Sequence, residues 1–180
     1  LLFLDADDWM LPEGLRVLVY AAQESESSGV FGSCTWFSES GAPLGYTNKP
    51  TCRRAGLNEL ISCNRFSIHS QLIPRSVLGH DRFDPSLRGC EDWELWLRLA
   101  RRGVTWTAIE SEVAAYRSVA ASRSKDYRAV LGATMKIIDD AFRAPPDEAL
   151  GAIDLSDERR MNIRMRHALE AATAIALDDP

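Results

Sequence analysis

The sequence predicts an α/β fold with a mixed sheet flanked by helices and a helical C-terminal tail. Three observations support this prediction: an apolar run at residues 1–4 that ends in acidic residues, alternating strand and helix patterns up to about residue 125, and helical periodicity beyond it. Alternation of the two patterns is typical of α/β domains. We therefore expect one α/β unit at residues 1–125 and a helical extension at residues 126–180.

The individual elements follow from local patterns. The unbroken apolar run Leu1–Leu4 predicts a strand covered on both faces. After Pro12, the helical spacing of Leu15, Leu18 and Val19 predicts a helix that ends near residues 25–29. The other expected elements are strands at 30–37, 68–73, 104–109 and 113–116, short helices at 57–63 and 75–78, and a polar loop at 39–50.

The clearest helix is predicted at residues 92–102. Trp93, Trp96, Leu97 and Ala100 share one stripe at helical spacing, and Gly103 is a good terminator. We expect the two tryptophans to pack in the core rather than to serve as platforms for a sugar. In the C-terminal part, two or three helices are expected, with a break at Pro145–Pro146.

Composition restricts the function. The chain has 180 residues and a formal charge of −5, which argues against nucleic acid as a partner, because such proteins need a basic face. The four cysteines form no C-x-x-C pair, so we expect reduced thiols. No apolar run approaches the ~20 residues that span a bilayer, so no transmembrane segment is predicted. We expect a cytoplasmic location, with peripheral contact with the inner face of the membrane as a further option.

An acidic cluster follows the first apolar run. Asp5, Asp7 and Asp8 stand at its carboxyl end, where open α/β sheets bind ligands. Crowded carboxylates repel one another and attract a cation, so a hard divalent ion such as Mg²⁺ or Mn²⁺, chelated by a diphosphate, would suit the site. The alternative is a polar turn in which Asp7 or Asp8 caps the next helix.

A second acidic pair, Glu91–Asp92, stands at the start of the helix at 92–102. A carboxylate in the first turn receives backbone N–H groups and the positive end of the helix dipole, which is a sufficient structural role. The functional interpretation is that Asp92, held rigidly there, acts as a general base toward an acceptor hydroxyl.

Taken together, the two motifs resemble family 2 glycosyltransferases of the GT-A fold. LLFLDADDW (residues 1–9) is similar to the D-x-D strand end of that family, and FDPSLRGCEDWELWLRL (residues 83–99) to its E-D-W-x-L-W-L-R segment. Arg75 matches a basic residue that family members often carry before the acidic loop. The resemblance covers residues 1–125 and implies that they form the acceptor and metal side of the domain. The family's first, nucleotide-binding strands are absent from the chain, so we expect an N-terminally truncated, inactive fragment.

The resemblance also implies roles for residues. Asp7 would be the main metal ligand, and Asp5 would assist it or contact the donor ribose. Asp92 would be the catalytic base, with Glu91 beside it shaping the acceptor site. The implied reaction, of the kind used in building cell-envelope polysaccharides, moves a sugar with inversion from a nucleotide-sugar donor to a hydroxyl acceptor. That acceptor is a glycan, a lipid-linked glycan or another hydroxyl compound, and the metal stabilises the departing diphosphate.

One departure from the family pattern affects the metal. Family members commonly carry Y-R-x-H-x-x-S-x-S, whose His helps to hold the metal or the diphosphate, whereas Val119 stands at the matching position of Tyr116–Ser124. Valine cannot ligate a metal. Either the affinity for metal or donor is reduced, or the diphosphate meets Arg117, which we assign to it, or Arg123 or Lys125 instead.

Two alternatives remain open at this stage. Val119 favours a non-catalytic GT-A-like binding or scaffold domain. Haloacid-dehalogenase-type phosphohydrolases also place D-x-D after an apolar strand and use a later Lys with an acidic pair, for which Lys136 and Asp139–Asp140 are the candidates. These three residues fall within a predicted continuous helix, which argues against the phosphohydrolase. His69 is expected either to touch an acceptor hydroxyl or, more simply, to be hydrogen-bonded near the core.

Overall fold

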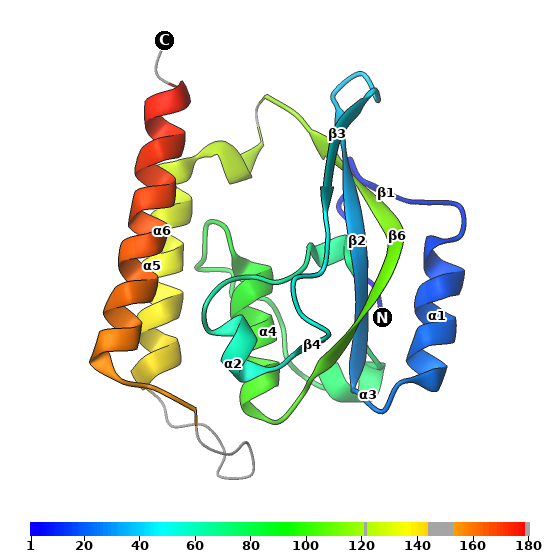
Figure 1. Ribbon diagram of the computed structural model, residues 1–180, viewed down its shortest axis with the longest axis horizontal. Helices are drawn as coiled ribbons and strands as arrows, with labels where there is room; N and C mark the ends of the chain where they lie inside the picture. The colour runs from blue at the N-terminus through cyan, green and yellow to red at the C-terminus, as the bar shows by residue number, and fades with distance from the viewer. Residues whose placement is uncertain (121, 144–152, 179–180) are drawn as a thin grey trace.

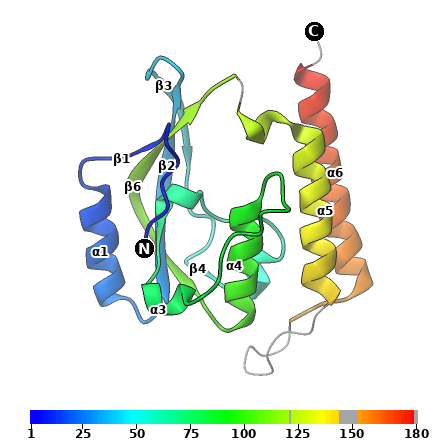
Figure 2. The same cartoon turned by 180° about the vertical axis from the view of Figure 1, so that it is seen from behind.

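A computed structural model describes residues 1–120, 122–143 and 153–178. A six-stranded mixed sheet lies at its centre, with helix α1 on one face and helices α2 and α4 on the other (Figures 1 and 2). Helices α5 and α6 pack side by side beyond α4. The predicted α/β class with a helical C-terminal region is confirmed.

The elements have the following bounds. The strands are β1 (Trp9–Met10), β2 (Gly29–Ser38), β3 (Pro43–Asn48), β4 (Arg54–Ala55), β5 (Gln71–Leu72) and β6 (Trp106–Ser118). The helices are α1 (Gly14–Glu24), α2 (Leu57–Leu60), η1 (Ile68–Ser70), α3 (Arg75–Leu78), α4 (Glu91–Arg101), η2 (Arg123–Lys125), α5 (Tyr127–Arg143) and α6 (Asp157–Asp178). The helices predicted at 75–78 and 92–102 thus agree with α3 and α4 to within one residue. Pro145–Pro146 lies outside the described residues.

The sheet is organised around one long parallel pair. The strand order is β1-β6-β2-β3, with β4 added to β6 and β5 to β2. β2 and β6 run parallel, whereas the other pairs are antiparallel. The register between β2 and β6 places Trp36 beside Tyr116 and Phe37 beside Arg117. Residues distant in sequence therefore meet at the carboxyl ends of these two strands.

The main core lies between the sheet and α4. Trp93, Trp96, Leu97 and Ala100 are all buried, as their spacing predicts, and the ring of Trp96 lies 5.9 Å from that of Phe66. The indole N–H of Trp93 donates to the Leu60 carbonyl at 2.7 Å. The tryptophans therefore anchor α4, and the expectation that they are core residues is confirmed.

The prediction that Leu1–Leu4 is a strand covered on both faces is wrong. This segment forms no strand, and Leu1 and Leu4 are 41% and 48% exposed. Within the described residues, its main-chain pairing is limited to Leu1, which exchanges hydrogen bonds with Ile73 at 2.6 and 3.0 Å. A strand needs a continuous ladder, and a single bonded pair does not supply one.

Three further boundaries differ from the sequence prediction. The polar loop expected at 39–50 contains strand β3, because a tight turn at Gly41 (φ 85°) returns the chain alongside β2. The two strands expected at 104–109 and 113–116 are one strand, β6, whose pairing with β2 shifts register between them. The strand expected at 68–73 is the short helix η1 followed by β5.

Candidate functional site

A pocket of about 620 Å³ lies between the sheet, the start of α4 and α5. Its walls come from residues 5–7, 67–69 and 89–92, together with single residues from β2, β6 and α5 and three from the segment after β6. This volume falls within the roughly 300–1,000 Å³ typical of small-molecule sites. The pocket is therefore large enough for a ligand of sugar size.

The acidic turn forms one wall. Asp5 and Asp7 line the pocket and are exposed to solvent, whereas Asp8 is buried beneath them. The Asp8 N–H donates to the Asp5 carbonyl at 3.2 Å and closes the turn. Helix α1 begins at Gly14 with Glu13 as its N-cap. The alternative in which Asp7 or Asp8 caps this helix is therefore excluded.

The start of α4 forms another wall. Glu91 and Asp92 stand in its first turn and line the pocket. Asn64 Nδ2 donates to Asp92 Oδ2 at 2.8 Å, and the Trp93 N–H donates to Oδ1 at 2.7 Å. Burial raises the pKa of Asp92 to about 6, although these hydrogen bonds counteract it. Asp92 is thus held in one orientation with a pKa near neutrality, as a general base requires.

The structure brings the two sequence motifs to one pocket. Asp5, Asp7, Glu91 and Asp92 all line it. None of the described lining residues is Lys or Arg. A diphosphate entering this acidic site would be repelled unless a cation accompanied it.

Arg117 lies behind the acidic turn rather than in the pocket wall. Its backbone N–H donates to Asp8 Oδ1 at 2.7 Å, and Nε donates to the Asp7 carbonyl at 2.9 Å. Nη1 donates to the Glu39 carbonyl at 2.9 Å, and the guanidinium lies 4.9 Å from the centre of the Trp9 ring. Arg117 is therefore bound to the turn, and its predicted role toward a donor diphosphate stays a prediction.

The segment after β6 borders the same pocket. Val119, which occupies the place of the family's His, lines it, together with Ser122 and Ser124. The Tyr116 hydroxyl lies 3.3 Å from Ser122 Oγ and 3.0 Å from Ser124 Oγ. Val119 offers the site no ligand atom.

A buried polar cluster beneath the turn was not predicted from the sequence. His69 Nδ1 lies 3.1 Å from Asp8 Oδ2, and both side chains are 2% exposed. His69 Nε2 lies 3.0 Å from Cys34 Sγ. Burial raises the pKa of Asp8 to about 6 and lowers that of His69 to about 4, so near neutral pH a carboxylate meets a neutral imidazole. Of the two roles expected for His69, the hydrogen-bonded core residue is confirmed.

The carboxylate pair suits a metal shared with a substrate. Among residues 1–120, 122–143 and 153–178, no three or more His, Cys, Asp or Glu side chains form a group that could hold a metal ion. Mg²⁺, however, is commonly bound by one or two carboxylates plus substrate phosphates rather than by a complete protein cage. Asp5 and Asp7 fit this mode, because both supply hard oxygen ligands and face the pocket.

The residues that a phosphohydrolase would need do not reach the pocket. Lys136 and Asp140 lie on α5, where Lys136 Nζ is 3.0 Å from Asp140 Oδ2, and Asp139 pairs with Arg164 of α6 at 2.5 Å. None of the three lines the acidic pocket. The prediction that they fall on a continuous helix is confirmed.

Comparison with known proteins supports the fold. No protein-family model and no curated protein matches the chain. Among solved structures, S. aureus TarS 1-349 in complex with UDP-GlcNAc matches 93% of the chain at 14% identity with a TM-score of 0.56. A second structure of TarS 1-349 matches 91% of the chain at 17% identity with a TM-score of 0.51. The chain therefore has a GT-A-like mixed α/β fold, shared with part of TarS.

The match is partial on the TarS side. The chain spans 47% and 44% of the two TarS chains, somewhat less than half of their length.

Within the described residues, no helix has both the length and the apolar composition needed to cross a bilayer.

Proposed function

We propose that this chain forms the acceptor and metal side of an inverting, metal-dependent glycosyltransferase of family 2. The observation that carries the proposal is that Asp5 and Asp7 share one pocket with Glu91 and Asp92. Transfer from a nucleotide sugar needs a cation-binding group at the leaving diphosphate and a base at the acceptor. The pocket has candidates for both tasks, within a GT-A-like fold.

The acidic turn would hold the donor. Asp7 would be the principal ligand of Mg²⁺ or Mn²⁺, and Asp5 would assist it or accept a hydrogen bond from the donor ribose. Bound there, the ion would neutralise charge on the departing nucleoside diphosphate. The bound UDP-GlcNAc of TarS supports a nucleotide sugar as the donor class. Arg117, fixed to the Asp7 carbonyl, would place its positive charge behind the turn and reduce repulsion of the diphosphate.

Helix α4 would handle the acceptor. Asp92 would take the proton from an acceptor hydroxyl while that oxygen attacks the anomeric carbon from the side opposite the diphosphate, which inverts the configuration. Asn64 and the Trp93 N–H fix the Asp92 carboxylate, which reduces the cost of aligning it. Glu91, beside it in the wall, would accept hydrogen bonds from other hydroxyls of the acceptor.

The test is a donor-turnover assay on the full-length protein, stripped of metal and then supplied with Mn²⁺. A panel of nucleotide sugars is offered, and release of nucleoside diphosphate is followed with and without glycan acceptors. We expect release that requires Mn²⁺ and a product of inverted anomeric configuration. Donor binding without turnover would favour a scaffold domain. Release of inorganic phosphate from a generic phosphate monoester would favour a phosphohydrolase.

Replacing Val119 by His should strengthen metal binding. Val119 lines the pocket and has no ligand atom, whereas the family's residue at this position is a His that helps to hold the metal. The expected gain in Mn²⁺ affinity is roughly tenfold, the lower end of the loss seen when groups that support a metal site are removed. Electron paramagnetic resonance of Mn²⁺ added to this chain measures it. Val119→Leu is the matched control, and equal affinities for the two variants would place Val119 away from the metal.

A further inference from the structure

Three segments meet beneath the acidic turn. Asp8 belongs to the turn, Cys34 to β2 and His69 to η1. His69 stands between the other two, with Nδ1 3.1 Å from Asp8 Oδ2 and Nε2 3.0 Å from Cys34 Sγ. Its ring also stacks on Tyr116 of β6 at 6.0 Å and 18°. Nε2 is thus hydrogen-bonded within the protein, and Nδ1 faces the buried Asp8 carboxylate.

The cluster is not a nucleophilic site, although Cys, His and Asp in this order resemble a thiol hydrolase. Cys34 is 1% exposed and is not among the residues that line the pocket. Burial raises the pKa of its thiol to about 12, so the thiolate that such chemistry requires is not formed near neutral pH. The role of the cluster is therefore structural rather than catalytic.

The turn is held from two sides. On one side, Arg117 binds it through Asp8 Oδ1 and the Asp7 carbonyl, at 2.7 and 2.9 Å. On the other side, Asp8 Oδ2 meets His69, in a contact that is electrostatic rather than a well-aligned hydrogen bond. Neither Asp8 Oδ2 nor His69 Nδ1 has a hydrogen-bond partner in the described part of the chain, so each atom has the other as its polar neighbour. Without His69, Asp8 Oδ2 would be buried with no polar neighbour, which is unfavourable, so Asp8 would shift toward water and move the turn.

We propose that His69 is a positioning residue, which keeps the Asp5–Asp7 turn in its pocket-facing conformation by pairing with Asp8. What the turn then binds rests on the proposed function, but the positioning itself does not. His69 thereby connects the acidic wall to β2 of the sheet and to the buried segment η1. Side chains that hold a site in place in this way are needed when the ligating groups lie on a turn rather than on a helix or strand.

Two variants of His69 separate positioning from packing. In His69→Asn, the amide nitrogen occupies the region of Nδ1 and retains a donor to Asp8. In His69→Gln, the amide lies nearer the region of Nε2, so the link to Cys34 is favoured and the link to Asp8 is lost. Both variants remove the ring. Cys34→Ala, which leaves the Asp8–His69 pair intact, is the third variant and the control.

The measurement is amide hydrogen exchange of this chain, read by mass spectrometry for residues 5–10 and, as a reference, for α4. We expect His69→Gln to speed exchange at residues 5–10 about tenfold relative to His69→Asn, with α4 unchanged, because the turn opens locally. Cys34→Ala should match the wild type at the turn. Equal exchange in the two His69 variants, or a rise spread over the whole sheet, would overturn the proposal.

A second readout connects the turn with its proposed ligand. Mn²⁺ affinity, measured by electron paramagnetic resonance, should fall roughly tenfold in His69→Gln relative to His69→Asn. If exchange changes as expected but the wild type binds no Mn²⁺, the metal part of the proposed function fails and the positioning role stands. If Mn²⁺ binds and exchange at the turn is the same in both His69 variants, the positioning role fails and the proposed function stands.

Discussion

Asp92→Asn in the full-length protein is expected to slow sugar transfer by about 10²- to 10⁴-fold, the usual contribution of a positioned general base. Asparagine keeps the size of the side chain and can still accept from the Trp93 N–H, and its NH₂ can donate to the Asn64 oxygen once that amide flips, so the fold should be retained. The loss should fall on kcat rather than on donor KM, because the proton is removed only in the transition state. Steady-state kinetics with saturating donor measure it.

The pH dependence gives a second signature of the same residue. A base acts only when it is deprotonated, and burial raises the pKa of Asp92 to about 6. The transfer rate should therefore be level above pH 7 and fall about tenfold per pH unit below pH 6. In Asp92→Asn this fall should disappear.

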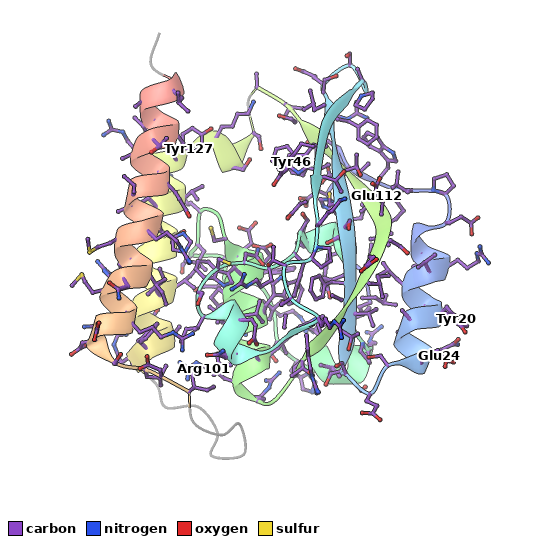
Figure 3. All side chains as sticks on the ribbon, in the orientation of Figure 1. Tyr20, Glu24, Tyr46, Arg101, Glu112 and Tyr127 are labelled. Atoms are coloured by element: carbon purple, nitrogen blue, oxygen red, sulfur yellow. The ribbon has the colours of Figure 1, made fainter. Side chains whose placement is uncertain are left out.

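Two further variants test whether the loss of activity is specific to Asp92. Glu91→Gln changes the neighbouring carboxylate in the same wall, and its effect is expected mainly in acceptor KM. Glu24→Gln changes a carboxylate on α1, outside the pocket (Figure 3), and should leave the kinetics unchanged. If Asp92→Asn retains full kcat, the base must be sought elsewhere and the transfer mechanism loses its principal residue.

Asp7→Asn is expected to lower Mn²⁺-dependent donor turnover by about 10²- to 10³-fold, the range found when one preorganised electrostatic group is removed. The amide carries no charge, so the cation that offsets the diphosphate would bind weakly in a pocket whose remaining acidic residues still repel the donor. Turnover measured across a Mn²⁺ titration shows whether the loss lies in metal affinity. Glu24→Gln again serves as the control.

A partial recovery of turnover at high Mn²⁺ would identify Asp7 as a ligand. An undiminished rate at low Mn²⁺ would contradict that assignment and leave Asp5 as the candidate. Asp5→Asn should then show the larger effect. Asp8 is unsuitable for this comparison because its side chain is buried and paired with His69.

Much of the fold and of the candidate site follows from local sequence patterns. Helix α4 was predictable because its apolar stripe is regular and Gly103 ends it, and the positive φ of that glycine, 85°, confirms the terminator. The convergence of Asp7 and Asp92 was predictable from the resemblance, since both motifs belong to a pattern whose members meet at one site. Local sequence patterns alone would not have predicted that Asp7 and Asp92 lie at one site.

The missed features depend on contacts between distant parts of the chain. The DADD sequence gives no sign that Asp8 turns inward while Asp5 and Asp7 turn outward, because its partners, His69 and the Arg117 N–H, come from far along the chain. β3 was missed because its composition is that of a loop, and only pairing with β2 makes it a strand. The apolar run Leu1–Leu4 was assigned as a strand because hydrophobicity reports burial preference and not the presence of hydrogen-bonding neighbours.

The parallel pairing of β2 with β6 has a consequence for how the molecule folds. Gly29 pairs with Trp106, so the formation of this pair closes a loop that contains η1 and α4. Closing so long a loop costs entropy before its contacts form, and topologies of this kind fold slowly. The pocket depends on the same closure, because its walls include residues before, within and after that loop. The acidic site should thus be among the last features to form during refolding, and a ligand bound there would select molecules that have completed the sheet.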